Sequence, residues 1–163
     1  MNEKTSKIEN DYIDGSDFFS IQKTQDIITT YTVRIDNDIT EAKEYDELFR
    51  VLEEALPTDR VILQLSSPGG DCHTLIRLVN AFNLCKAPII VYVIGVCQSA
   101  AAMLALCGDS LHVFPNTYLM FHNYSSVDMG KGKELVDSVG RTEKWLRGFY
   151  EKMCCPFLSK KEL

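Results

Sequence analysis

Short runs of apolar residues, spaced by polar turns, predict five β-strands along the chain. Residues 30–35 alternate between apolar and polar positions, as in a strand with one buried face. Residues 60–66 are largely apolar, as expected of a parallel strand that is covered on both faces, and residues 89–94 form a further apolar run. Residues 111–114 and 118–122 predict two further strands, which Pro115 and Asn116 join.

Helical periodicity lies between these predicted strands. One helix follows the capping residues 38–41 and ends at Pro57, with its apolar positions three and four residues apart: Tyr45, Leu48, Phe49, Leu52 and Leu56. A second helix follows Asp71, a good N-cap residue, and its apolar face holds Leu75, Ile76, Val79 and Phe82. A short alanine-rich helix is expected over 99–106. Strands that alternate with helices predict an α/β fold with right-handed crossovers.

The last third of the chain predicts a long amphipathic arm. A polar stretch over 123–133 precedes a helix from Glu134 to about Met153, and the apolar side of that helix holds Leu135, Val139, Trp145, Leu146, Phe149 and Tyr150. One folded core does not need so long an apolar arm. Self-association is therefore the preferred interpretation, and packing of the helix on its own domain is the alternative.

The chain divides into a short tail and one domain. Residues 1–25 are polar and predict a flexible N-terminal segment, and residues 26–163 predict a single domain whose arm covers about 123–155. Ser159 and Glu162 have the spacing of a capping box, so a further helix begins there, and we expect the natural product to continue beyond Leu163.

Composition narrows the function classes. A net charge of −6 gives no basis for binding nucleic acid or an anionic membrane. Lys86 and Pro88 interrupt the most apolar region, and the N-terminus has no signal-peptide pattern, so no membrane segment is expected. The six cysteines, at 72, 85, 97, 107, 154 and 155, form no C-x-x-C pair. They predict reduced thiols in the cytoplasm or an equivalent organelle compartment, without metal or organic cofactor.

A serine, a glycine turn and a histidine lie at the ends of three predicted strands. Ser99 lies between the strand over 89–94 and the alanine helix, a turn over 67–70 follows an earlier strand, and His122 ends a later one. Sites in open α/β sheets form at the carboxyl ends of strands, and a histidine can take the proton of a serine nucleophile. Each residue also has a structural interpretation: Ser99 as a helix N-cap, and His122 as a structural histidine.

These segments resemble the ClpP family, the proteolytic subunits of Clp proteases. The resemblance covers roughly residues 31–150, and its motifs read Ser67-Pro68-Gly69-Gly70, Gly95-Val96-Cys97-Gln98-Ser99-Ala100-Ala101 and Pro115-Asn116-Thr117-Tyr118-Leu119-Met120-Phe121-His122. The resemblance implies the layered βαβ repeats of the ClpP/crotonase fold, with the arm as a handle helix.

The resemblance also implies the roles of site residues. Ser99 would be the nucleophile and His122 the general base of a serine endopeptidase. The N–H groups of Gly70 and Ala100 would form the oxyanion hole, and Gly69, Asn123 and Tyr124 would bind substrate. The family places a third catalytic residue, an Asp, beyond the handle; Asp128 and Asp137 do not match that motif, so this residue is expected after Leu163.

The partners implied are copies of the same chain in two stacked seven-membered rings, a hexameric ATPase unfoldase of the ClpX, ClpA or ClpC type, and unfolded polypeptide as substrate. Alternatives remain. A crotonase-type enzyme acting on acyl-CoA is disfavoured by the Ser99 and His122 pair. A viral maturation protease, a signal-peptide peptidase and a catalytically silent ring subunit stay open.

Overall fold

The computed structural model describes residues 28–127 and 129–154 in full, together with the backbone of residues 11–13 and 21–23. The two short segments are strands β1 (Asp11–Ile13) and β2 (Ile21–Lys23), which pair antiparallel. The flexible tail expected over 1–25 falls otherwise outside the described residues, as does the capping box at Ser159, and both stay predictions.

The main sheet is parallel throughout. Its order is β3 (Thr30–Ile35), β4 (Arg60–Ser67), β5 (Ile89–Gln98) and β6 (Ser110–Val113), and β7 (Tyr118–Met120) also pairs with β5. Strand β6 pairs with the first half of β5 and β7 with its last three residues, both in the parallel sense. The Pro115-Asn116 segment therefore carries the chain onward along one edge of β5 and does not reverse it.

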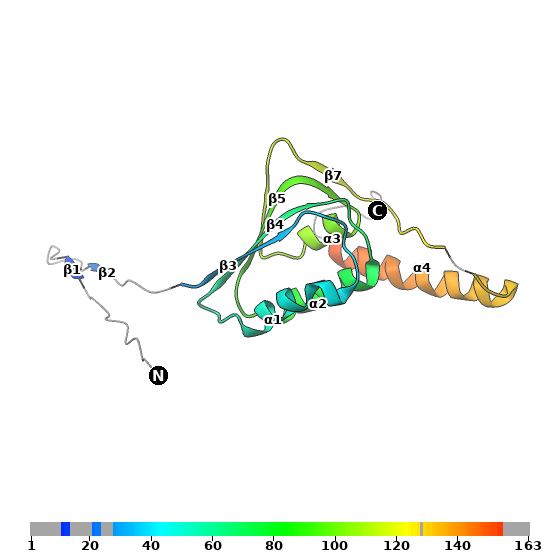
Figure 1. Cartoon of the computed structure of the whole chain (residues 1–163), viewed down its shortest axis with the longest axis horizontal. Helices are drawn as coiled ribbons and strands as arrows, with labels where there is room; N and C mark the ends of the chain where they lie inside the picture. Colours follow the sequence, from blue (N-terminus) through cyan, green and yellow to red (C-terminus); the bar gives the residue numbers. More distant parts are fainter. Residues whose placement is uncertain (1–10, 14–20, 24–27, 128, 155–163) are drawn as a thin grey trace.

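The helices of the body all pack on one face of this sheet (Figure 1). They are the 3-10 turn η1 (Ala42–Tyr45), α1 (Asp46–Glu54), α2 (Cys72–Leu84) and α3 (Ala100–Ala105). Along β4, Val61, Leu63 and Leu65 are buried beneath them, and the alternate residues on the other face are half-buried. The expectation that this strand is covered on both faces is wrong for the single chain, because no described helix lies over its second face.

Several element boundaries differ from expectation. The first helix begins as a 3-10 turn and is α-helical only from Asp46, and Leu56 lies beyond its end with 59% of its surface exposed. Strand β5 continues four residues past Ile94 to Gln98, because its last residues pair with β7. Helix α3 begins one residue later than expected, at Ala100.

The arm is helix α4 (Gly132–Cys154), about 35 Å long at the helical rise. Its C-terminal part packs against the body through Phe149, Tyr150, Met153 and Cys154, and Leu146 is also buried. Its N-terminal part extends past the body, as Figure 1 shows, and Val136 and Trp145 are 72% and 52% exposed. Among the described helices, this one included, none has the length and apolarity that crossing a membrane requires. One end of the arm therefore packs on its own domain and the other leaves apolar side chains uncovered, and self-association through them stays a prediction.

Candidate active site

Ser99 has the most unusual backbone of the described residues. Its φ of 52° and ψ of −123° make it the one residue other than glycine with positive φ in the described part of the chain. Such a conformation costs roughly 1–3 kcal/mol and is found mainly at functional sites. Ser99 occupies the N-cap position of α3, as its structural interpretation expects, but its side chain makes no capping hydrogen bond. The turn instead leaves its hydroxyl unused by the helix.

Backbone hydrogen bonds fix Ser99 between three elements. Its N–H donates to the carbonyl of Met120 at 2.8 Å, and its own carbonyl accepts from the N–H of Met103 in α3 at 3.1 Å. Met120 is also the partner of Gln98 in the β5–β7 register. His122 follows Met120 by two residues, so the sheet brings Ser99 and His122 to the same edge.

The side chains of Ser99 and His122 are not hydrogen-bonded to each other among the described residues, and His122 is exposed. Hydrogen bonds of catalytic groups are often long or open before substrate binds. No described carboxylate contacts His122: Asp137 is exposed on α4, and Asp128 lies outside the described residues. The assignment of these two residues as nucleophile and base stays a prediction.

The glycine turn lies directly against Ser99. A Cβ built on Gly69 would be 2.6 Å from the Gln98 carbonyl oxygen, 2.8 Å from Ser99 Cβ and 3.0 Å from the backbone nitrogen of Ala100. Gly69 also has a φ of 99°, which L side chains rarely adopt. Behind it, the buried Ser67 hydroxyl accepts a hydrogen bond from the Gly69 N–H at 3.1 Å. The turn can therefore hold only glycine here, and it lies beside the nitrogen expected to serve the oxyanion hole.

The other half of the turn is held by Ile39, a residue that the sequence analysis did not single out. Its N–H donates to the Gly69 carbonyl and its carbonyl accepts from the Asp71 N–H, both at 2.7 Å. A Cβ on Gly70 would collide with the Ile39 carbonyl oxygen, and Gly70 has a φ of 144°. Periodicity could not reveal Ile39, because it is one apolar residue between exposed polar neighbours.

Electrostatics near the site favour a hydroxyl nucleophile over a thiol. Burial raises the pKa of Cys97 to about 12, so this thiol, two residues before Ser99, stays protonated near neutral pH. Burial, with a smaller contribution from Cys154, likewise raises the pKa of Cys107 to about 12. Cys72, Cys85, Cys97 and Cys107 are free thiols, in agreement with the sequence. No group of three or more metal-binding side chains occurs in the part of the chain that the structure describes.

Asp71 caps α2 as the sequence predicted. Its carboxylate accepts a hydrogen bond from the Thr74 N–H at 2.7 Å. Burial alone would raise the pKa of this carboxyl. The hydrogen bonds from Thr74, with a smaller contribution from His73, outweigh that effect and lower its pKa. Asp71 therefore stays ionised and fixes the end of the glycine turn onto the helix.

Asn123 and Tyr124 follow His122 on the segment that leads from β7 to α4 (Figure 1). The Asn123 side chain accepts a hydrogen bond from the Tyr124 N–H at 2.9 Å, Asn123 is exposed and Tyr124 is half-buried. Their expected role in substrate binding stays a prediction.

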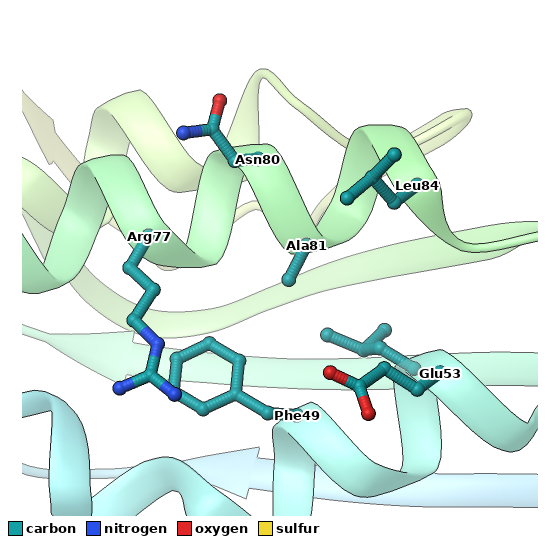
Figure 2. A pocket seen from close by; sticks show the side chains of 7 residues that line it. Phe49, Glu53, Arg77, Asn80, Ala81 and Leu84 are labelled. Carbon is teal, nitrogen blue, oxygen red and sulfur yellow. The ribbon is translucent and has the colours of Figure 1, made fainter.

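A separate hollow of about 340 Å³ lies between α1 and α2. Figure 2 shows the Arg77 guanidinium lying over the Phe49 ring, 4.1 Å from its centre, with Glu53 and Leu84 farther along. None of the predicted catalytic residues lines this hollow. It is therefore distinct from the site at Ser99.

Comparison with known proteins gives one family and one named relative. The Clp protease family matches residues 16–151. The ATP-dependent Clp protease proteolytic subunit of Leuconostoc citreum (strain KM20) is 30% identical over 73 residues. That alignment covers 44% of this chain and 36% of the relative, so the matched part spans about a third of the relative's length. The fold, the parallel sheet with its C-terminal helix, agrees with the match, and the chain belongs to the Clp protease family.

Proposed function

We propose that this chain is a serine endopeptidase, which cuts unfolded polypeptides to short peptides as the proteolytic subunit of an ATP-dependent Clp-type protease. The observation that carries the proposal is the strained turn at Ser99 with Gly69 packed against it. A serine held at positive φ between a strand and a helix, with a glycine turn beside it, has little structural benefit. A turn of this kind supports a role in which the Ser99 hydroxyl and nearby backbone N–H groups act on one substrate carbonyl.

Each group then has a defined step. Ser99 Oγ attacks the scissile carbonyl carbon while His122 takes the hydroxyl proton, and the carbonyl becomes a tetrahedral oxyanion. The N–H groups of Gly70 and Ala100 stabilise that oxyanion, at roughly 3–4 kcal/mol for each donor. The C–N bond breaks as His122 returns the proton to the leaving amine. Water, activated by His122, then hydrolyses the ester on Ser99 and regenerates the hydroxyl.

An extended substrate would lie along the chain after β7. Asn123 and Tyr124 continue the edge on which His122 lies and belong to no strand, so they can pair with a peptide by β-addition. Gly69 has no side chain to obstruct a peptide that approaches Ser99.

The partners proposed are further copies of the chain and an unfoldase. The uncovered apolar side chains of α4, with Val136 and Trp145 among them, support assembly of arms into stacked seven-membered rings. The relative is named an ATP-dependent protease subunit, which supports a hexameric ATPase as the source of unfolded substrate. We place this assembly in the cytoplasm or an equivalent organelle compartment.

Labelling with a fluorophosphonate probe tests the proposal. Wild type should be labelled and Ser99→Ala should not. Ser110→Ala is the matched control, because the Ser110 hydroxyl lies 3.1 Å from His112 Nε2 on an ordinary exposed strand. Labelling that disappears in Ser110→Ala and persists in Ser99→Ala would overturn the assignment of the nucleophile.

A catalytically silent ring subunit is the second candidate. It is favoured by one observation: among the described residues, His122 is hydrogen-bonded neither to Ser99 nor to a carboxylate. A histidine without an orienting acid loses on the order of 10⁴ in rate. An assembled protein in which Ser99 is not labelled would support this candidate over the endopeptidase.

A further inference from the structure

Gly70 follows the end of β4, and the strands on the two sides of β4 are β3 and β5. The sheet order β3-β4-β5 continues beyond the strand ends: Ile39 follows β3, Gly70 follows β4 and Ser99 follows β5. Ile39 and Gly70 form a parallel bridge, through the hydrogen bonds from the Ile39 N–H to the Gly69 carbonyl and from the Asp71 N–H to the Ile39 carbonyl.

This bridge determines the direction of the Gly70 N–H. In this parallel bridge, Ile39 is hydrogen-bonded to the two residues on either side of Gly70, namely Gly69 and Asp71. The N–H and carbonyl of Gly70 itself therefore point away from Ile39, to the opposite side of the strand. The peptide between Gly69 and Gly70 is trans, so its N–H also points away from the carbonyl that Ile39 holds. The opposite side is the side of β5, where Gly69 packs against Ser99 and Ala100.

We propose that Ile39 is a positioning residue, whose backbone holds the Gly69–Gly70 peptide so that the Gly70 N–H is aimed at the oxyanion beside Ser99. The catalytic part of this inference rests on the proposed endopeptidase function. Ile39 touches neither substrate nor the reacting atoms, and acts through the turn.

The Ile39 side chain anchors this backbone. Only 2% of its surface is exposed, and it packs in the main core, while Asp38 and Thr40 on either side are exposed. Truncation of the side chain should therefore loosen the segment without removing a hydrogen-bonding group. Ile35 is a matched control, because it is another buried isoleucine of the same core, at the end of β3 and four residues before the bridge.

Amide hydrogen exchange on the assembled full chain tests the positioning without reference to activity. In Ile39→Ala, exchange over residues 67–75 should rise roughly tenfold, because the bridge opens locally. In Ile35→Ala it should stay near wild type over the same residues. Exchange that is equal in the two variants would overturn the proposal, whether or not the protein is a peptidase.

Peptide hydrolysis tests the catalytic consequence. Complete loss of one oxyanion donor costs about 10²–10³ in kcat, so Ile39→Ala should lower kcat at least about tenfold while KM stays near wild type. A tetrahedral peptide boronate should bind more weakly by the same factor. Ile35→Ala should change kcat less than about threefold. Equal losses of kcat in both variants would overturn the positioning role.

The two proposals fail in different ways. If wild type hydrolyses no peptide and is not labelled at Ser99, the endopeptidase function fails, and exchange over residues 67–75 still decides whether Ile39 holds the turn. If wild type is active and Ile39→Ala keeps both its kcat and its affinity for the boronate, the function stands and the positioning role fails.

Discussion

Gly69 lies so close to Ser99 that a Cβ on the glycine would be 2.8 Å from the serine Cβ. The two residues are thirty positions apart in the sequence, and the contact exists because β4 and β5 are paired neighbours. The space around the Ser99 hydroxyl is therefore shaped by backbone from two strand ends, and small changes there should affect chemistry more than folding elsewhere.

Gly69→Ala should reduce peptide hydrolysis and serine labelling at least about 100-fold, because the new methyl meets backbone atoms of Gln98 and Ala100 that cannot move aside cheaply. The free energy of unfolding should fall by about 1–3 kcal/mol, given the positive φ as well. Gly140→Ala is the control: nothing lies within 4 Å of its Cβ, and the helix should gain about 0.5–1 kcal/mol. Normal labelling of Gly69→Ala would contradict the close contact.

Ser99→Gly should be more stable than Ser99→Ala by about 1 kcal/mol, because alanine keeps the Cβ that positive φ disfavours and glycine does not. Neither variant should be labelled by a fluorophosphonate. Denaturant unfolding of the two assembled variants measures the difference. An alanine variant as stable as the glycine variant would show that the turn is not strained.

Asp71→Ala should lower the free energy of unfolding at pH 7 by about 1 kcal/mol, because the Thr74 N–H loses its cap. The folded pKa of Asp71 lies below its unfolded value of 3.8. The stabilisation is therefore present above pH 3.8 and is lost as the pH falls through the folded pKa.

Urea unfolding at a series of pH values checks this dependence. The gap between wild type and Asp71→Ala should narrow below pH 3.8, and Asp71→Asn should stay within a few tenths of a kcal/mol of wild type at pH 7, since asparagine is an equally good cap. A gap that does not change with pH would rule out the contribution of the charge.

Trp145 can report on the arm. It is the single tryptophan of the chain and is half-exposed on α4. If the arms pair, its fluorescence emission should shift to shorter wavelength as the protein assembles, and return on dilution below the assembly range. Trp145→Phe gives the background, and sedimentation velocity gives the oligomeric state at each concentration. An emission maximum that stays constant while the sedimentation coefficient rises would place Trp145 outside the contacts between copies.

The strands of the main sheet, the helices and their alternation could be read from the sequence, because each depends on side-chain periodicity within one segment. Asp71 was predicted as a helix cap for the same reason, and the family resemblance was confirmed by the match over residues 16–151. Ser99, Gly69 and His122 were found from local motifs at strand ends, although their catalytic roles remain predictions.

Only the tertiary structure decided what depends on strand register. The positive φ of Ser99, its hydrogen bond to Met120 and its contact with Gly69 all require β4, β5 and β7 to end at one level. The bridge between Ile39 and Gly70 requires β3 to lie beside β4, on the side away from β5. The periodicity of the sequence does not reveal this bridge. The pattern of apolar and polar residues within one segment specifies a helix or a strand, because the neighbours of each residue along the chain are fixed. Contacts between residues twenty or more positions apart arise only when the strands pair.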